Sequence, residues 1–73
     1  MSADKIIRMA NQIALFMESK PHDEGVAGLA AHINDFWEPR MRRQFFELLD
    51  AGGDGMRPLV IEAAAQIRRP EPA

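Results

Sequence analysis

The chain has 73 residues, no cysteine and a formal net charge of −2. The lack of cysteine excludes disulfides, thiolate metal sites and cysteine nucleophiles. The slight acidic surplus argues against a general nucleic-acid binder, which normally carries a basic surplus. A chain of this length buries only about 60% of the surface that it exposes when unfolded, so we expect very good helix packing or a partner to supply further stability.

The sequence contains no sign of a membrane span or a secretory signal. No apolar stretch approaches the ~18 residues of a spanning helix. The first residues, MSADK, lack a basic region followed by an apolar one. Cytoplasm is therefore the default compartment.

Apolar spacing predicts a helix over residues 3–19, with Ser2 as its N-cap. Leu15 falls in the polar face of this helix. After a break at Pro21, a second helix is predicted over 24–36, with the Asp23 carboxylate as its cap. Small residues at 27, 28, 30 and 31 would let another helix approach closely. The predicted apolar stripes are Ile6, Met9, Ala10, Ile13, Phe16 and Met17 in the first helix, and Val26, Leu29, Ala30, Ile33, Phe36 and Trp37 in the second.

Two further helices are predicted over 39–50 and 58–68, each opened by a proline at its first position. The glycine-rich stretch 51–55 would stop the former helix. The chain is thus expected to form an all-α fold, a bundle of four short helices in one domain over 1–69, with a disordered tail over 70–73. The predicted core faces are Met41, Phe45, Leu48 and Leu49, then Val60, Ala63, Ala64 and Ile67.

No motif for catalysis or ligand binding is apparent in the sequence. There is no catalytic triad, and the glycines at 52–55 lack the lysine and the preceding strand of a phosphate loop. His22 and His32 do not have the spacing that places two imidazoles on one helix face. We therefore predict no catalytic, cofactor-binding or metal-ligating residue, and the sequence argues against an enzyme.

The stretch from Trp37 to Phe46 is unusual because it places three arginines beside aromatic residues. Tryptophan and arginine dominate binding hot spots. Arg42 and Phe46 are i,i+4 neighbours off the core stripe, so Phe46 is expected to be partly exposed beside guanidinium groups. Trp37 lies on its helix's apolar stripe, so it either fills the core or shows one edge at an interface.

Three segments resemble a known family. They are residues 5–14 (KIIRMANQIA), 36–42 (FWEPRMR), and 51–53 (AGG) followed by 58–60 (PLV). In the same order, they are similar to the start, the hallmark Trp-acidic-Pro-Arg-Met-Arg segment and the C-terminal part of the delta subunit of NAD-dependent, molybdenum-containing formate dehydrogenases. Glu38 stands where aspartate is commoner in the family, and glutamate caps a helix less well.

The resemblance implies a non-catalytic accessory subunit of a soluble cytoplasmic complex. In such a complex the alpha subunit carries the bis-molybdopterin guanine dinucleotide molybdenum centre and iron–sulfur clusters. Beta and gamma subunits pass electrons through flavin (FMN) and further clusters to NAD, and the delta subunit carries no cofactor. It would stabilise the alpha subunit or help its maturation, and would associate with the assembled alpha/beta/gamma complex. The predicted docking residues are Trp37, Arg40, Arg42 and Phe46, with Arg8 and Asn11 as secondary candidates.

Two other functions remain open on sequence grounds. One is a small helical DNA-binding regulator that uses Arg40, Arg42 and Arg43, although the acidic charge balance weighs against it. The other is a homodimer that buries its apolar surplus against a second copy of itself.

Overall fold

The computed structural model describes residues 2–70, which form four α-helices and no strand. α1 spans Ala3–Met17, α2 His22–Phe36, α3 Pro39–Asp50 and α4 Pro58–Ala63, and a 3-10 turn, η1, follows over Ala64–Gln66. The predicted all-α bundle of four short helices is thus confirmed. Of the tail predicted over 70–73, only Pro70 belongs to the described residues. No helix in this part of the chain is long and apolar enough to cross a membrane.

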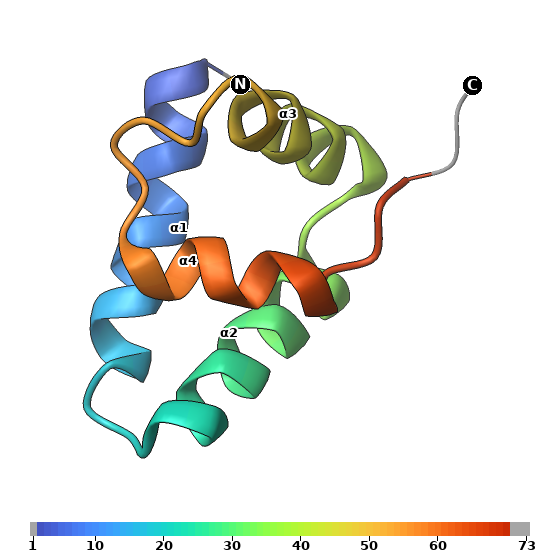
Figure 1. The fold of residues 1–73 in the computed structure, drawn as a ribbon. Coiled ribbons are helices and arrows are strands. Elements are labelled where there is room, and N and C mark those ends of the chain that lie inside the picture. Colours follow the sequence, from blue (N-terminus) through green and yellow to red (C-terminus); the bar gives the residue numbers. More distant parts are fainter. Residues whose placement is uncertain (1, 71–73) are drawn as a thin grey trace.

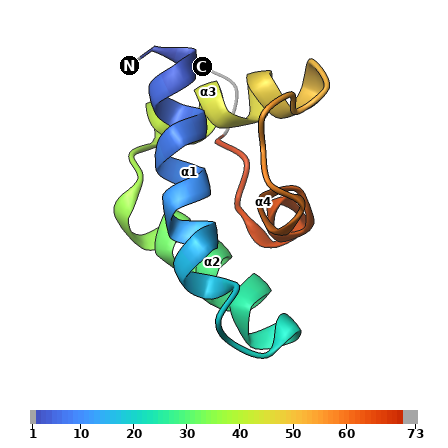
Figure 2. The same cartoon turned by 90° about the vertical axis from the view of Figure 1, so that its left-hand side faces the viewer.

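The four helices are arranged around one another in a simple way. α1 and α2 diverge from a short turn, and α4 lies across both of them (Figure 1). α3 packs against α1, at the end away from the α1–α2 turn. Figure 2 shows α4 end-on, beside α1 and below α3. The centre of the molecule is therefore filled by side chains from every helix.

The core contains most of the predicted apolar stripes, but two of their members are wrong. Phe16 is 64% exposed and Phe36 is 73% exposed. In α1 the fully buried residues repeat as Ile6, Ala10 and Ala14, which moves the centre of the inward face away from Phe16. Leu15 is exposed, as predicted. The buried apolar residues are Ile6, Ala10, Ala14, Val26, Leu29, Ala30, Ile33, Trp37, Phe45, Phe46, Met56, Leu59, Val60, Ala63, Ala64 and Ile67.

The helix starts follow the predicted capping in part. The Ser2 hydroxyl accepts a hydrogen bond from the Lys5 N–H at 3.2 Å, so this N-cap is confirmed. The predicted Asp23 cap is wrong, because α2 begins at His22, two residues before the predicted start, and no side chain caps it. Asp23 instead lies in the first turn, where its charge favours the helix dipole. Glu38 stands at the N-cap of α3 and makes no side-chain cap, as expected for glutamate.

α1 and α2 approach closely where small residues face α1. A Cβ added at Gly25 would lie 2.6 Å from the Met17 carbonyl oxygen, and one added at Gly28 would lie 2.9 Å from the Met17 sulfur. Ordinary carbon contacts lie at about 3.5–4.0 Å. Only glycine therefore fits at position 25 without moving the backbone of α1.

The last predicted helix, 58–68, ends earlier than its apolar spacing suggests. After Ala63 the chain tightens into η1, and Ile67 takes an extended conformation with φ −91° and ψ 129°. The Asn34 amide donates to the Gln66 carbonyl at 3.0 Å and accepts from the Arg68 N–H at 2.8 Å. These bonds, from α2 to the end of η1, hold a non-helical exit that keeps Ile67 in the core.

The turn between α3 and α4 has the predicted glycine chemistry. Gly52, Gly53 and Gly55 all have positive φ, and the Gly53 N–H donates to the Leu48 carbonyl at 3.0 Å, closing the end of α3. This turn lets α4 return across α1 and α2.

Candidate partner-binding surface

The family-like stretch 36–42 joins α2 to α3 with only two residues between the helices. The Trp37 N–H donates to the Ile33 carbonyl at 3.0 Å, so Trp37 closes α2. Trp37 and Glu38 both have extended backbones, and Pro39 begins α3. Because successive extended residues point in opposite directions, Trp37 is directed inward while Glu38 faces solvent.

The outer side of this junction presents a mixed aromatic and charged surface. We call it the junction surface, and its exposed residues are Phe36, Glu38, Pro39, Arg40 and Arg43.

Phe36 is the large hydrophobic residue of the junction surface and is 73% exposed. Its ring lies 4.8 Å from that of His32, centre to centre, at 38°. Complete burial of a phenylalanine against a partner contributes about 1.5–3 kcal/mol. The sequence analysis missed Phe36 as a surface residue because it falls on the apolar stripe of α2. It is exposed because Trp37, the next residue, fills the core position at this end.

Trp37 and Phe46, two of the predicted docking residues, are core residues. Each is only 5% exposed. Phe45 joins them through edge-on contacts, with ring centres 6.3 Å from Trp37 and 5.2 Å from Phe46. The expectation that Phe46 is partly exposed is therefore wrong. Its ring is covered by the Arg69 guanidinium at 4.2 Å, a contact that the sequence analysis missed because Arg69 is remote in the chain.

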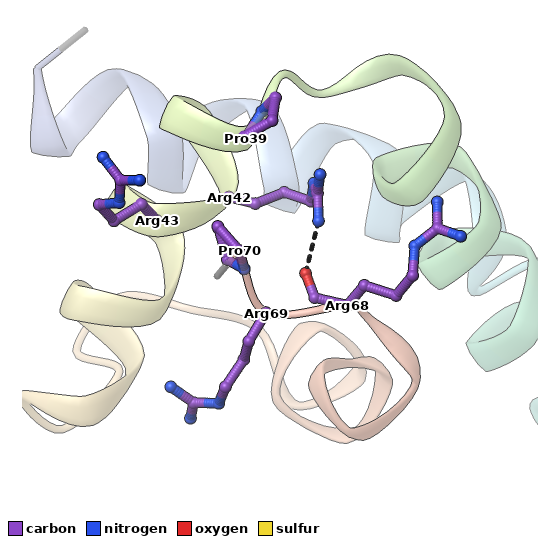
Figure 3. Close-up of a pocket in the computed structure, with 6 residues that line it drawn as sticks. All are labelled: Pro39, Arg42, Arg43, Arg68, Arg69 and Pro70. Carbon is purple, nitrogen blue, oxygen red and sulfur yellow. Dashed lines mark hydrogen bonds between the residues drawn. The ribbon is translucent and has the colours of Figure 1, made fainter. Parts of the chain in front are cut away.

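Arg42 and Arg40 have different surroundings although both were predicted to dock. The Arg42 guanidinium donates to the Arg68 carbonyl at 2.7 Å, and its Nε lies 3.4 Å from the Trp37 carbonyl oxygen (Figure 3). Arg42 thus ties the start of α3 to the segment after η1. Arg40 is exposed and makes no polar side-chain contact with the rest of residues 2–70. Of the two, Arg40 is the one available to a partner.

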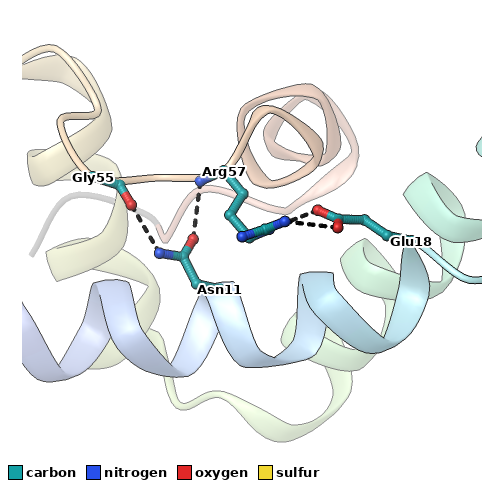
Figure 4. A network of polar contacts seen from close by, with 4 residues as sticks. All are labelled: Asn11, Glu18, Gly55 and Arg57. Atoms are coloured by element: carbon teal, nitrogen blue, oxygen red, sulfur yellow. Dashed lines mark hydrogen bonds and ion pairs between the residues drawn. The ribbon is translucent and has the colours of Figure 1, made fainter.

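Asn11 and Arg8, the secondary candidates, also differ. The Asn11 amide donates to the Gly55 carbonyl at 2.8 Å and accepts from the Arg57 N–H at 2.9 Å (Figure 4). The Arg57 guanidinium makes two hydrogen bonds to the Glu18 carboxylate, at 2.7 and 2.9 Å, which hold the pKa of that carboxyl below its ordinary value. Asn11 therefore fixes the entry to α4, whereas Arg8 is exposed on α1.

Among residues 2–70, no three His, Cys, Asp or Glu side chains gather closely enough to hold a metal ion. The His22 side chain lies 2.6 Å from the Glu62 carboxylate on the surface, and the His32 ring lies 4.8 Å from the Phe36 ring, centre to centre.

Comparison with known proteins gives one match. A protein-family model described as NADH-dependent formate dehydrogenase delta subunit (FdsD) matches residues 5–64 of the chain. The matched range includes all of α1 except its first two residues, and the whole of α2, the junction, α3 and α4. No curated protein and no solved structure matches.

Proposed function

From the premise that this chain belongs to the family of NADH-dependent formate dehydrogenase delta subunits, we propose that it is an accessory subunit that docks on the alpha subunit of that enzyme through the junction surface. The observation that carries the proposal is the exposed aromatic and charged surface formed by the segment that resembles the family's hallmark. In this proposal the redox chemistry of molybdenum, iron–sulfur clusters, FMN and NAD stays with the other subunits, in the cytoplasm.

The composition of the junction surface supports a protein partner. Phe36 offers a large apolar contact, and Arg40 offers a guanidinium with no competing partner among the described residues. Aromatic residues and arginines are the side chains that contribute most to protein interfaces. The core lies directly beneath, since Trp37 of the same junction packs edge-on against Phe45 at 6.3 Å.

Docking would stabilise the alpha subunit or assist its maturation. A subunit that binds only the folded alpha chain raises the stability of that chain by mass action. A delta subunit that acts during maturation would instead be needed before the cofactors are inserted, and loss of the chain would then lower the molybdenum content of the enzyme.

The test is capture of the alpha subunit from cells that produce all the subunits with a tagged copy of this chain. A Phe36→Ala/Arg40→Ala variant is compared with a Phe16→Ala/Lys20→Ala control. The control also removes an exposed aromatic ring with a cation near it, since Lys20 Nζ lies 5.4 Å from the Phe16 ring. Both control residues precede α2, Phe16 in the last turn of α1 and Lys20 in the following turn. The 15 residues of α2, about 22 Å, lie between them and the junction.

We expect the wild type and the control variant to capture the alpha subunit and the junction variant to lose capture by about tenfold or more. All three should have the same far-UV circular dichroism. Unchanged capture by the junction variant would overturn the assignment of the surface, and failure of the wild type to capture any formate dehydrogenase subunit would overturn the accessory function itself.

A further inference from the structure

Next to the junction surface lies a pocket of about 470 Å³ whose walls are four arginines and two prolines. We call it the arginine pocket. Among residues 2–70, no acidic residue belongs to its lining, although the whole chain carries a net charge of −2. It is lined by Pro39, Arg42, Arg43, Arg68, Arg69 and Pro70.

The pocket is assembled by tertiary contacts that bring two distant arginine pairs together. Asn34 accepts a hydrogen bond from the Arg68 N–H at 2.8 Å, and Arg42 donates to the Arg68 carbonyl at 2.7 Å. The backbone of Arg68 is therefore held on both sides. Arg69 is fixed by two hydrogen bonds to Asp50, at 3.0 and 3.2 Å, and by the ring of Phe46.

The charges in the pocket are only partly neutralised. Asp50 compensates Arg69, while Arg42 donates only to uncharged carbonyls. The Arg68 guanidinium makes one long contact, 3.4 Å, to the Asn34 carbonyl. Arg43 has no hydrogen bond or ion pair with the other described residues. A carboxylate that meets Arg43 or Arg68 would therefore not compete with an acidic side chain among residues 2–70.

The directions of the side chains indicate which kind of anion fits. Figure 3 shows the four guanidinium groups pointing to different sides around Pro70, so they do not converge on one point. A single phosphate would need the donors to meet at one place. Carboxylates spread over a protein surface can each meet a different guanidinium, and arginine binds carboxylates in a two-pronged manner. The pocket also has no aromatic wall on which a base could stack.

We infer that the arginine pocket binds an acidic segment of the protein partner, several Asp or Glu side chains that meet Arg43 and Arg68 in particular. The inference rests on the proposed function, since it deepens the contact made by the junction surface. The two sites are continuous, because Pro39 and Arg43 belong to both. Apolar contact through Phe36 and charge contact through the pocket would together fix one orientation of the partner.

The first experiment reverses charge in the pocket of the full chain. An Arg43→Glu/Arg68→Glu variant is compared with Lys5→Glu/Lys20→Glu, which changes the formal charge by the same amount at exposed sites elsewhere. The backbone bonds of Arg68 survive its substitution, so the fold should be retained, which thermal unfolding checks. We expect the pocket variant to weaken alpha-subunit binding at 50 mM NaCl at least tenfold and to reduce its salt dependence, with the control within twofold of wild type.

The second experiment finds the carboxylates directly. Arg43→Lys and Arg68→Lys variants keep the charge and introduce amines that a carbodiimide joins to a carboxylate in contact. We expect mass spectrometry to find cross-links from positions 43 and 68 to a cluster of Asp or Glu residues of the partner. Native Lys5 and Lys20 report the background level of cross-linking.

Three outcomes would overturn the inference. If wild type and pocket variant capture the alpha subunit equally, the pocket is not part of the contact, although the proposed function stands. Cross-links no more frequent than those of the native lysines would have the same meaning. The third outcome is that the wild type binds a 20-base-pair DNA duplex in a salt-sensitive manner and the pocket variant does not. This result would assign the arginines to nucleic-acid phosphates instead.

Discussion

Replacement of Asn11 by alanine tests whether this residue stabilises the fold or contacts the partner. Asn11 and Asn34 act as a pair of clamps at the two ends of the last helical segment. Each asparagine donates to a carbonyl and accepts from the N–H two residues later. Asn11 binds Gly55 and Arg57 before α4, and Asn34 binds Gln66 at the end of η1 and Arg68 beyond it. Because α4 has only six residues, these clamps replace much of what a longer helix would supply itself.

The expected cost follows from the bonds that are lost. Asn11→Ala removes two hydrogen bonds, each worth about 0.5–1.5 kcal/mol net, and leaves the part-buried Arg57 N–H without its acceptor. We expect a loss of about 2 kcal/mol in the free energy of unfolding, which for a domain of this size lowers Tm by roughly 8–16 °C. The bonds of Asn34 are exposed, so Asn34→Ala should cost about 1 kcal/mol.

Urea unfolding followed by circular dichroism measures both variants, with exposed Gln12→Ala as the control. Asn11→Asp keeps the acceptor for Arg57 but turns a second oxygen toward the Gly55 carbonyl, so it should be less stable than wild type. At a temperature where Asn11→Ala is folded, it should still capture the alpha subunit. Wild-type stability combined with lost capture would refute the clamp and restore Asn11 as a contact residue.

Two further predictions concern helix approach and pH. Gly25→Ala should lower the free energy of unfolding by about 1–3 kcal/mol, because its Cβ meets the Met17 backbone oxygen, which cannot move alone. Gly28→Ala meets only the flexible end of the Met17 side chain and gains helix propensity of about 1 kcal/mol, so it should be much less destabilising in the same urea titration; equal losses would contradict the close approach. Hydrogen bonds from arginines hold the pKa values of Glu18 and Asp50 below their ordinary 4.5 and 3.8. The stabilisation is therefore present above those ordinary values and is lost as pH falls below them through the depressed values. A Glu18→Gln/Asp50→Asn variant should lose less stability than wild type on acidification from pH 5 to 3, and an identical pH dependence would show that the ion pairs do not contribute.

The sequence predicted the helices well because their signals are local. The prolines at 39 and 58 start α3 and α4 at the predicted residues, and the glycine turn ends α3 at Asp50. The errors arise where tertiary contacts override local preference. α4 ends at Ala63 because the hydrogen bonds of Asn34 hold the following residues in a non-helical conformation. Nothing within residues 58–68 themselves predicts this contact with α2.

The candidate site was predicted only in outline. The segment from Trp37 to Arg43 was identified by its composition and resemblance, but the helical wheel placed Phe36 inside and Phe46 partly outside, the reverse of the structure. For Phe36 the helical periodicity assumes that α2 continues, whereas the chain becomes extended at Trp37. Phe46 is covered by Arg69, which is remote from it in the chain. The arginine pocket depends on Arg68 and Arg69 meeting α3, a long-range contact that one sequence read alone does not contain.

We propose that this chain is a component of a formate dehydrogenase, held by the junction surface. Native mass spectrometry of the enzyme purified through a tag on its alpha subunit tests it most directly. The account predicts a mass step of 8.2 kDa for each bound copy of this chain, and predicts that the Phe36→Ala/Arg40→Ala variant loses this step while the Phe16→Ala/Lys20→Ala control keeps it. An enzyme of the same mass with and without the wild-type chain would contradict the account.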